Sequence, residues 1–156
     1  VVLTYATVAA TAYGGIALSA QLFGADARPD FPAITSLSQY LLIMGIVWTT
    51  AAFGEEMLFR GFLMTRLSEV FGGGAVSWAI ALIASSVMFG LVHAYQGAPG
   101  ILMTGLAGAA FGLWYLIGRR NLLPLIIAHG LIDTVSITVL YLVETGVLPP
   151  ETIPGL

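Results

Sequence analysis

Five long apolar segments, separated by short polar or glycine-rich stretches, constrain the fold of this chain more than any other feature. Most of them approach or exceed the ~20 residues that a helix needs to cross a bilayer. Because the bilayer core offers no water to unpaired peptide groups, such spans satisfy their own hydrogen bonds as helices. The predicted fold is therefore all-α, a polytopic membrane helical bundle with about five transmembrane helices. The expected spans cover residues 1–23, 37–70, 75–95, 101–117 and 122–143.

Composition agrees with a membrane protein that forms one domain over residues 1–156. Hydrophobic residues make up 58% of the chain and charged residues only 8%, whereas a soluble domain carries about 25% charged residues. The net charge is −3 and no basic run occurs, so nothing supports a nucleic-acid partner. The chain has no cysteine, which excludes disulfides and thiolate metal sites. The expected surroundings are a lipid bilayer, and from the small size we expect a prokaryotic inner membrane.

The arginines predict how the chain is oriented. Arg66, Arg119 and Arg120 fall on the same side of the expected spans as the N-terminus. Cytoplasmic loops carry an excess of basic residues, so this side is predicted to be cytoplasmic. The polar loop over residues 24–36 and the proline-rich tail over residues 144–156 are expected outside the bilayer on the other side.

Six ionisable side chains nevertheless lie inside the spans, and they include both histidines of the chain. A charge near the bilayer centre costs roughly 3 kcal/mol on insertion scales, and such residues usually face a cavity or a partner at a functional site. We therefore expect these six side chains to meet in a polar cavity between helices: Glu55, Glu56, Arg60, His93, His129 and Asp133.

The acidic pair in the second span divides into two roles. Glu56 and Arg60 are four residues apart, so they share a helix face and are expected to form a structural ion pair. Glu55 lies about 100° further round the helix, which leaves its carboxylate for chemistry. The alternative is that Glu55 is a second acid held in a network of bonds between helices.

The two histidines each have a partner at the same spacing. Phe89 precedes His93 by four residues, and we expect its ring to pack beside the imidazole and restrict its rotation. Asp133 follows His129 by four residues; it can fix the tautomer of the ring or face the cavity directly. The alternatives are a structural hydrogen-bonding histidine and a bond within one helix.

Taken together, these residues favour chemistry on a water molecule. One glutamate and two histidines from three helices can surround a single water and supply a general base and groups that stabilise an oxyanion. Those are the two requirements of amide hydrolysis. Intramembrane Glu, His and Asp also build the proton relays of transporters, but the chain has no visible inverted repeat of the kind that carriers use.

Three motifs occur in this order along the chain: Glu55-Glu56-x-x-x-Arg60, Phe89-x-x-x-His93 and His129-x-x-x-Asp133. Together they resemble the CPBP (CAAX protease and bacteriocin-processing) family of intramembrane proteases, also called the Abi or Rce1-like family. Its core would cover about residues 37–143. The resemblance implies hydrolysis of a peptide bond in a membrane-anchored substrate, with a prenylated CAAX-type peptide as one candidate, and it implies that Glu56 and Arg60 brace the site.

The same resemblance implies roles for four catalytic residues. Glu55 and His93 would activate the attacking water, and His129 and Asp133 would line the oxyanion side. The third motif ends in Asp where the eukaryotic CAAX endopeptidases have Asn, and the family pattern allows either. An ionised aspartate cannot donate to an oxyanion, so we favour a role in which Asp133 orients His129.

A metal is a further alternative, because the family is often described as metalloproteases. A zinc site would use Glu55, His93 and His129 with the fourth position open. The chain lacks the H-E-x-x-H helix of the usual zinc proteases, and a glutamate base helped by histidine needs nothing added, so we favour the cofactor-free mechanism. Two other functions stay open: a non-catalytic immunity or scaffold protein of the same fold, and a proton-coupled transporter. The motifs carry no signal for an oligomeric state.

Overall fold

A computed structural model describes residues 1–24, 33–149 and 152, and the predicted loop over 24–36 and the tail over 144–156 lie partly outside them. The described residues form helices and no strand, and five helical segments are long and apolar enough to cross a membrane. This confirms the predicted all-α membrane fold. In chain order the elements are α1 (Val2–Phe23), α2 (Leu37–Ile46), η1 (Val47–Met64), α3 (Thr65–Val70), α4 (Ala75–Val92), η2 (Ala94–Gln96), α5 (Gly97–Ile117) and α6 (Leu123–Glu144).

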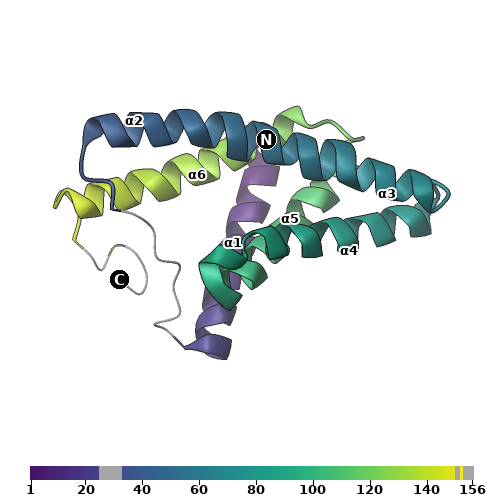
Figure 1. The fold of residues 1–156 in the computed structure, drawn as a ribbon, viewed down its shortest axis with the longest axis horizontal. Coiled ribbons are helices and arrows are strands. Elements are labelled where there is room, and N and C mark those ends of the chain that lie inside the picture. Colours follow the sequence, from purple (N-terminus) through teal and green to yellow (C-terminus); the bar gives the residue numbers. More distant parts are fainter. Residues whose placement is uncertain (25–32, 150–151, 153–156) are drawn as a thin grey trace.

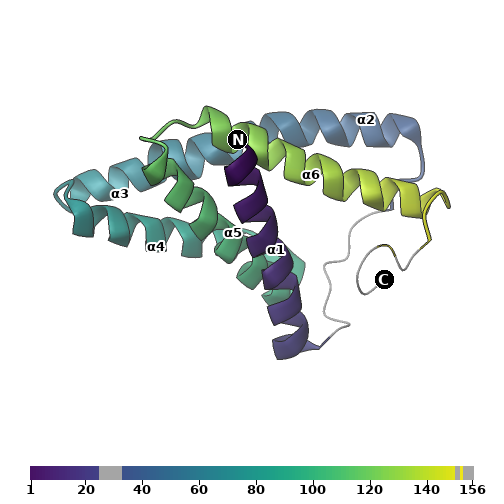
Figure 2. The ribbon, with the colours of Figure 1, turned by 180° about the vertical axis from the view of Figure 1, so that it is seen from behind.

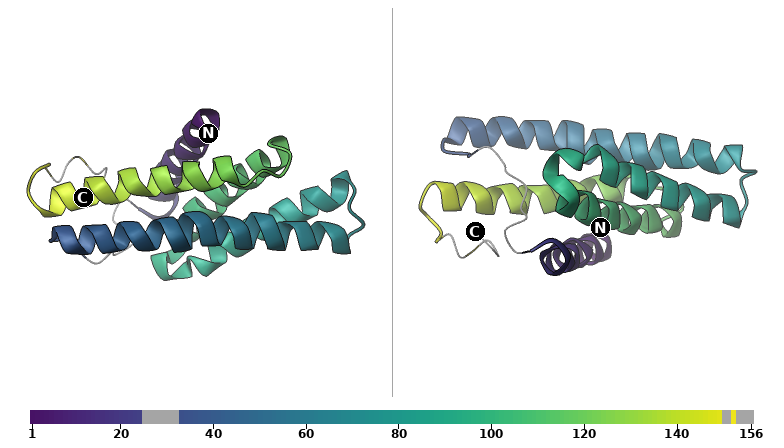
Figure 3. Two further views of the ribbon diagram at one scale, coloured as in Figure 1. Left: turned by 90° about the horizontal axis from the view of Figure 1, so that it is seen from above. Right: turned by 60° about the horizontal axis from the view of Figure 1, so that its bottom comes forward.

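The second span is one continuous rod made of α2, η1 and α3 (Figure 1). The α6 helix runs beside the first part of this rod and α4 beside the second part, as the view from above also shows (Figure 3). The α1 helix crosses the bundle and packs mainly on α5 and α6 (Figure 2). The middle of the rod, η1, therefore contacts both α4 and α6.

Local sequence signals begin and end this rod. The Ser36 hydroxyl accepts the backbone N–H of Gln39, and the Gln39 side chain accepts the N–H of Ser36, which together form a capping box. At the other end Gly72 and Gly73 have φ values of 96° and 75°. Glycine adopts this left-handed conformation at no steric cost, so the chain turns back there into α4.

The central part of the rod, η1, winds as a π-helix. Such winding is rare, and the single-turn π-bulges in which it is usually seen are frequent at functional sites. Two threonines mark the entry to it: the hydroxyl of Thr49 donates to the carbonyl of Gly45, and that of Thr50 donates to the carbonyl of Ile46, both at 2.7 Å. Hydroxyl bonds of this type bend helices. Glu55 and Glu56 follow these threonines within the same π-helical segment.

The boundaries between the third and fourth spans differ from the predicted 75–95 and 101–117. The α4 helix ends at Val92, and α5 begins at Gly97 after a single 3₁₀ turn. Pro99 falls between these two predicted spans, but it lies in the first turn of α5. A proline is tolerated there because the first N–H groups of a helix have no partner within the helix.

The α4 and α5 helices approach each other closely through small residues. A Cβ atom on Gly90 would lie 2.6 Å from the carbonyl oxygen of Ile101, and one on Gly108 would lie 3.0 Å from the Phe89 ring. Close approach of this kind is how membrane helices gain van der Waals contact. In the same region, the backbone carbonyl of Gly108 accepts a hydrogen bond from the side chain of Arg60 in η1.

Large apolar side chains cover the outside of the bundle. Leu41, Leu42, Phe62 and Val87 are all more than half exposed. A soluble protein rarely shows such extensive apolar surface, whereas a lipid bilayer covers it. The interior holds small polar residues and the charged side chains of the predicted site, which are the groups that lipid disfavours.

Candidate active site

Arg60 and Glu56 form the most deeply buried pair of the site. Nη1 of Arg60 lies 2.9 Å from Oε1 of Glu56, as the spacing of four residues predicts, and the two residues are 1% and 0% exposed. Nη2 of Arg60 donates to the carbonyl of Gly108 at 3.2 Å. The guanidinium also lies 4.5 Å from the ring centre of Phe89 and 5.1 Å from that of Phe111. These contacts compensate the desolvation of a buried charge pair.

Glu56 has a second partner that local sequence pattern does not predict. Its Oε1 atom also accepts the Nδ1–H of His129, at 2.9 Å, across 73 residues of sequence. The His129 ring stacks on Phe111, with ring centres 5.0 Å apart. Glu56 therefore connects the braced arginine to the third motif, and the Nε2 atom of His129 is left to face the rest of the site.

His93 is oriented through the backbone. Its Nδ1 atom lies 2.7 Å from the carbonyl oxygen of Phe89. Because a carbonyl only accepts hydrogen bonds, Nδ1 carries the proton, and Nε2 of the neutral ring is an acceptor. The Phe89 ring lies beside the imidazole as predicted, with centres 4.8 Å apart, and it also covers Arg60.

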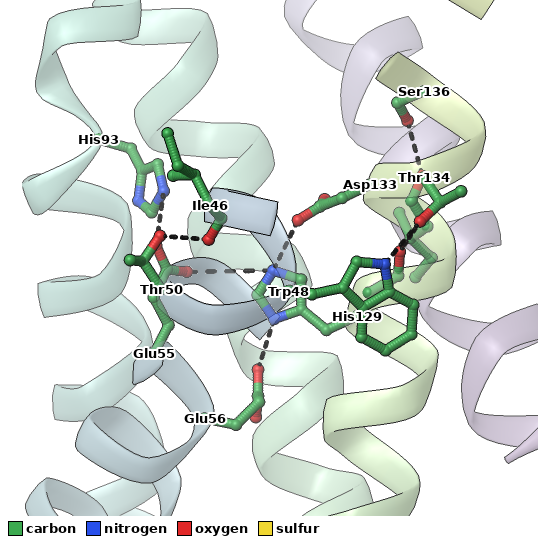
Figure 4. Close-up of polar contacts among 12 residues, drawn as sticks. Ile46, Trp48, Thr50, Glu55, Glu56, His93, His129, Asp133, Thr134 and Ser136 are labelled. Carbon is green, nitrogen blue, oxygen red and sulfur yellow. Dashed lines mark hydrogen bonds and ion pairs between the residues drawn. The ribbon is translucent and has the colours of Figure 1, made fainter. Parts of the chain in front are cut away.

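Glu55 lies between the two histidines. Its Oε1 atom is 4.0 Å from Nε2 of His93 and its Oε2 atom is 4.0 Å from Nε2 of His129 (Figure 4). The Glu55 side chain is 28% exposed, against 12% and 10% for the histidines. These separations exceed a direct hydrogen bond, but one water bonded to both atoms would span each of them. The structure thus brings together the glutamate and both histidines that sequence analysis singled out.

Asp133 completes the group from α6. Its Oδ2 atom lies 3.5 Å from Nε2 of His129, and its side chain is 28% exposed. The sequence favoured a role in which Asp133 orients His129; in the structure it is Glu56, and not Asp133, that contacts Nδ1 of that ring. Asp133 instead faces the same side of the imidazole as Glu55 (Figure 4).

Further contacts hold α6 against the rod and were not predicted. The indole Nε1 of Trp48 donates to the hydroxyl of Thr134 at 3.1 Å, and the hydroxyls of Tyr40 and Thr138 are 2.9 Å apart. A Cβ atom on Gly130 would lie 2.6 Å from the Trp48 ring. The threonines, four residues apart on one face of α6, were the available signal. These contacts fix the part of α6 that carries the third motif.

A polar cavity around these side chains stays a prediction. The described clefts are apolar: one lies between α4 and α5, and the other lies between α1 and α6. Neither is lined by Glu55, His93, His129 or Asp133.

The candidate zinc ligands have suitable atoms but lie further apart than zinc requires. Both histidines hold their Nδ1 protons outside the centre, as metal-ligating histidines do, so Glu55, His93 and His129 have suitable chemistry. With Zn–N and Zn–O bonds of 2.0–2.2 Å, two ligand atoms of a tetrahedral site lie roughly 3.4 Å apart, against 4.0 Å here. In the described part of the chain, no three histidine, cysteine, aspartate or glutamate side chains lie close enough together to hold a metal ion. The set would have to contract by about half an ångström to coordinate zinc.

Comparison with known proteins supports the resemblance. The family model described as Type II CAAX prenyl endopeptidase Rce1-like matches residues 37–135, which include every residue of the three motifs. Searches of curated proteins and of solved structures found no match. The family match covers more than half of the chain and confirms the family that the motifs indicate. The chain therefore belongs to the Type II CAAX prenyl endopeptidase Rce1-like family.

Proposed function

We propose that this protein is an intramembrane endopeptidase that hydrolyses a peptide bond of a membrane-anchored substrate, with a prenylated CAAX-type peptide as the first candidate. One observation carries the proposal: the Glu55 carboxylate lies 4.0 Å from Nε2 of both His93, which directly follows α4, and His129 in α6. Membership of the Rce1-like family supports a protease that acts on membrane-anchored substrates.

The space between Glu55, His93 and His129, called the centre below, is lined mainly by hydrogen-bond acceptors. This favours a water molecule as the reactant. Nε2 of neutral His93 and both oxygens of Glu55 accept hydrogen bonds and cannot satisfy one another. A water about 2.8 Å from each atom would donate to both. Glu55 then takes one proton from this water as a general base, while the water oxygen attacks the scissile carbonyl carbon.

The other side of the centre suits the oxyanion that forms. With Glu56 accepting the Nδ1–H, His129 is stabilised as an imidazolium whose Nε2–H points toward the centre. That N–H would donate to the carbonyl oxygen as it becomes negative. When the carbon–nitrogen bond breaks, the proton on Glu55 passes to the leaving nitrogen. This returns the site to its starting state with an acid and an amine as products.

In this mechanism Asp133 has a different task from the one favoured by its sequence position. It lies 3.5 Å from Nε2 of His129, on the substrate side. As a carboxylate, Asp133 stabilises the His129 imidazolium before the substrate binds. When it has taken up a proton from solvent, the neutral acid donates to the oxyanion alongside His129. A zinc ion, if the centre contracts to hold one, would supply Lewis-acid chemistry.

The test is cleavage of a farnesylated CAAX peptide by the purified protein in lipid micelles, with the unfarnesylated peptide as a comparison. Glu55→Gln keeps the shape of the side chain and removes the base, so cleavage should fall to background while the helical circular dichroism is unchanged. Glu69→Gln is the matched control, because Glu69 is an exposed acid in the same rod, paired with Arg66 at the surface. It should retain activity.

Other outcomes would favour the alternatives. Equal cleavage by wild type and Glu55→Gln would contradict the glutamate-base mechanism. Binding of the farnesylated peptide without cleavage would favour a non-catalytic protein of the same fold. Uptake driven by a proton gradient in reconstituted vesicles, lost in Glu55→Gln, would favour a transporter.

A further inference from the structure

The turn between α5 and α6 holds two arginines in an unusual backbone conformation. Arg119 and Arg120 have φ values of 57° and 65°, in the left-handed region. Helices often end with a residue in this conformation, but it is usually glycine, sometimes asparagine, because a Cβ atom is strained there. Two consecutive arginines accept this strain, which points to a role for their side chains.

The guanidinium groups of this turn are available to a ligand. Both residues are exposed, and neither forms an ion pair or a side-chain hydrogen bond with another residue in the described ranges. The Arg120 guanidinium lies 5.2 Å from the ring centre of Trp78. Stacking of this kind uses the face of the guanidinium and leaves the N–H donors around its edge open.

The position of the turn selects the kind of ligand. It joins two spans, and Trp78 lies in the first turn of a third span, α4. These helix ends therefore lie at one surface of the bilayer, at the level of lipid headgroups, where tryptophan is enriched. The end of α5 is also tied to the rod, because the hydroxyls of Tyr115 and Thr65 are 3.3 Å apart. The turn is thus held against the bundle near the headgroups.

We propose that Arg119, Arg120 and Trp78 form a binding site for the phosphodiester headgroup of an anionic membrane lipid. The two guanidinium forks would bind the phosphate oxygens, and the indole would lie beside the glycerol region. Arg66 lies in the same rod immediately after Thr65, but its Nη1 is already bound by Glu69 at 2.6 Å. It serves as a matched arginine whose charge is compensated.

The experiment measures thermal unfolding of the purified protein in neutral phosphatidylcholine micelles during titration with phosphatidylglycerol, and counts retained phosphatidylglycerol by native mass spectrometry. We expect phosphatidylglycerol to raise the melting temperature of the wild type. The double variant R119Q/R120Q should need roughly thirtyfold more of it for the same shift. Arg66→Gln should respond like the wild type, and Trp78→Leu should show a smaller loss than the double variant.

A second double variant separates lipid binding from folding of the turn. R119G/R120G relieves the left-handed strain, so its melting temperature without anionic lipid should exceed that of the wild type. Its response to phosphatidylglycerol should still be lost. R119K/R120K keeps the charges without the forks, and should keep only part of the response.

Three results would overturn the assignment. R119Q/R120Q or R119G/R120G with an unchanged lipid response would show that the arginines do not bind the headgroup. An equal loss in Arg66→Gln would show an effect of general surface charge. An equal stabilisation by millimolar inorganic phosphate in neutral micelles would identify a site for free anions instead of lipid.

Discussion

The Glu56 carboxylate accepts the Nδ1–H of His129 at 2.9 Å, while the adjacent Glu55 faces Nε2 of the same ring at 4.0 Å. Two neighbouring residues of one helix therefore approach opposite edges of one imidazole on another helix (Figure 4). The inner glutamate is fully buried with Arg60, and the outer one is partly exposed. This difference in burial gives the two carboxylates different expected behaviour on substitution.

Glu56→Gln should lower both stability and activity. It leaves the Arg60 charge buried without a counter-charge, which costs about 3–5 kcal/mol in comparable buried pairs. It also removes the anion that stabilises a charged His129. The measurement is thermal unfolding together with kcat, with Glu55→Gln as the comparison, which should lose cleavage and keep its melting temperature. A folded, inactive Glu56→Gln beside a fully active Glu55→Gln would mean that the two roles are exchanged.

Asp133→Asn should retain cleavage, whereas Asp133→Leu should lose about two orders of magnitude in kcat, the effect of removing one oxyanion donor. The amide of asparagine donates through its NH₂ group, and leucine has no donor. Steady-state kinetics on the same peptide separates kcat from KM. An inactive asparagine variant with normal folding would contradict the donor role and would require the negative charge of Asp133.

Gly130→Ala should reduce kcat by tenfold or more, because the new Cβ would lie 2.6–2.7 Å from the Trp48 ring and would push away the turn of α6 that carries His129. The check is a rescue experiment: Trp48→Leu combined with Gly130→Ala makes room for the methyl group and should recover part of the activity. Failure of the pair to improve on Gly130→Ala alone would exclude this steric contact as the cause.

Cleavage should survive incubation with a strong chelator if Glu55 acts as a general base without metal. The 4.0 Å separations between Glu55 and the histidine Nε2 atoms suit an intervening water better than a shared zinc ion. The measurement is activity before and after chelation, with metal content determined by mass spectrometry of the same sample. Loss of activity that added zinc restores would assign Glu55, His93 and His129 as ligands.

Much of the fold follows from local properties of the sequence. Long apolar runs specify spanning helices because each such helix satisfies its own backbone, and the five expected spans are present. Spacings of four residues specify neighbours on one helix, so the Glu56–Arg60 pair and the packing of Phe89 beside His93 were predictable. Even here, the start of α5 was misplaced, because Pro99 is compatible with both a loop and a first helical turn.

What the sequence by itself determined is therefore the set of helices, the family and the residues that we propose for the site. Only the tertiary structure decided which atoms meet: that Glu56 holds Nδ1 of His129, that Asp133 lies at Nε2, and that Trp48 packs against Gly130. The physical reason is that helical periodicity fixes contacts within four residues. Contacts between helices depend on the register and crossing of whole helices, which the summed packing of many side chains determines.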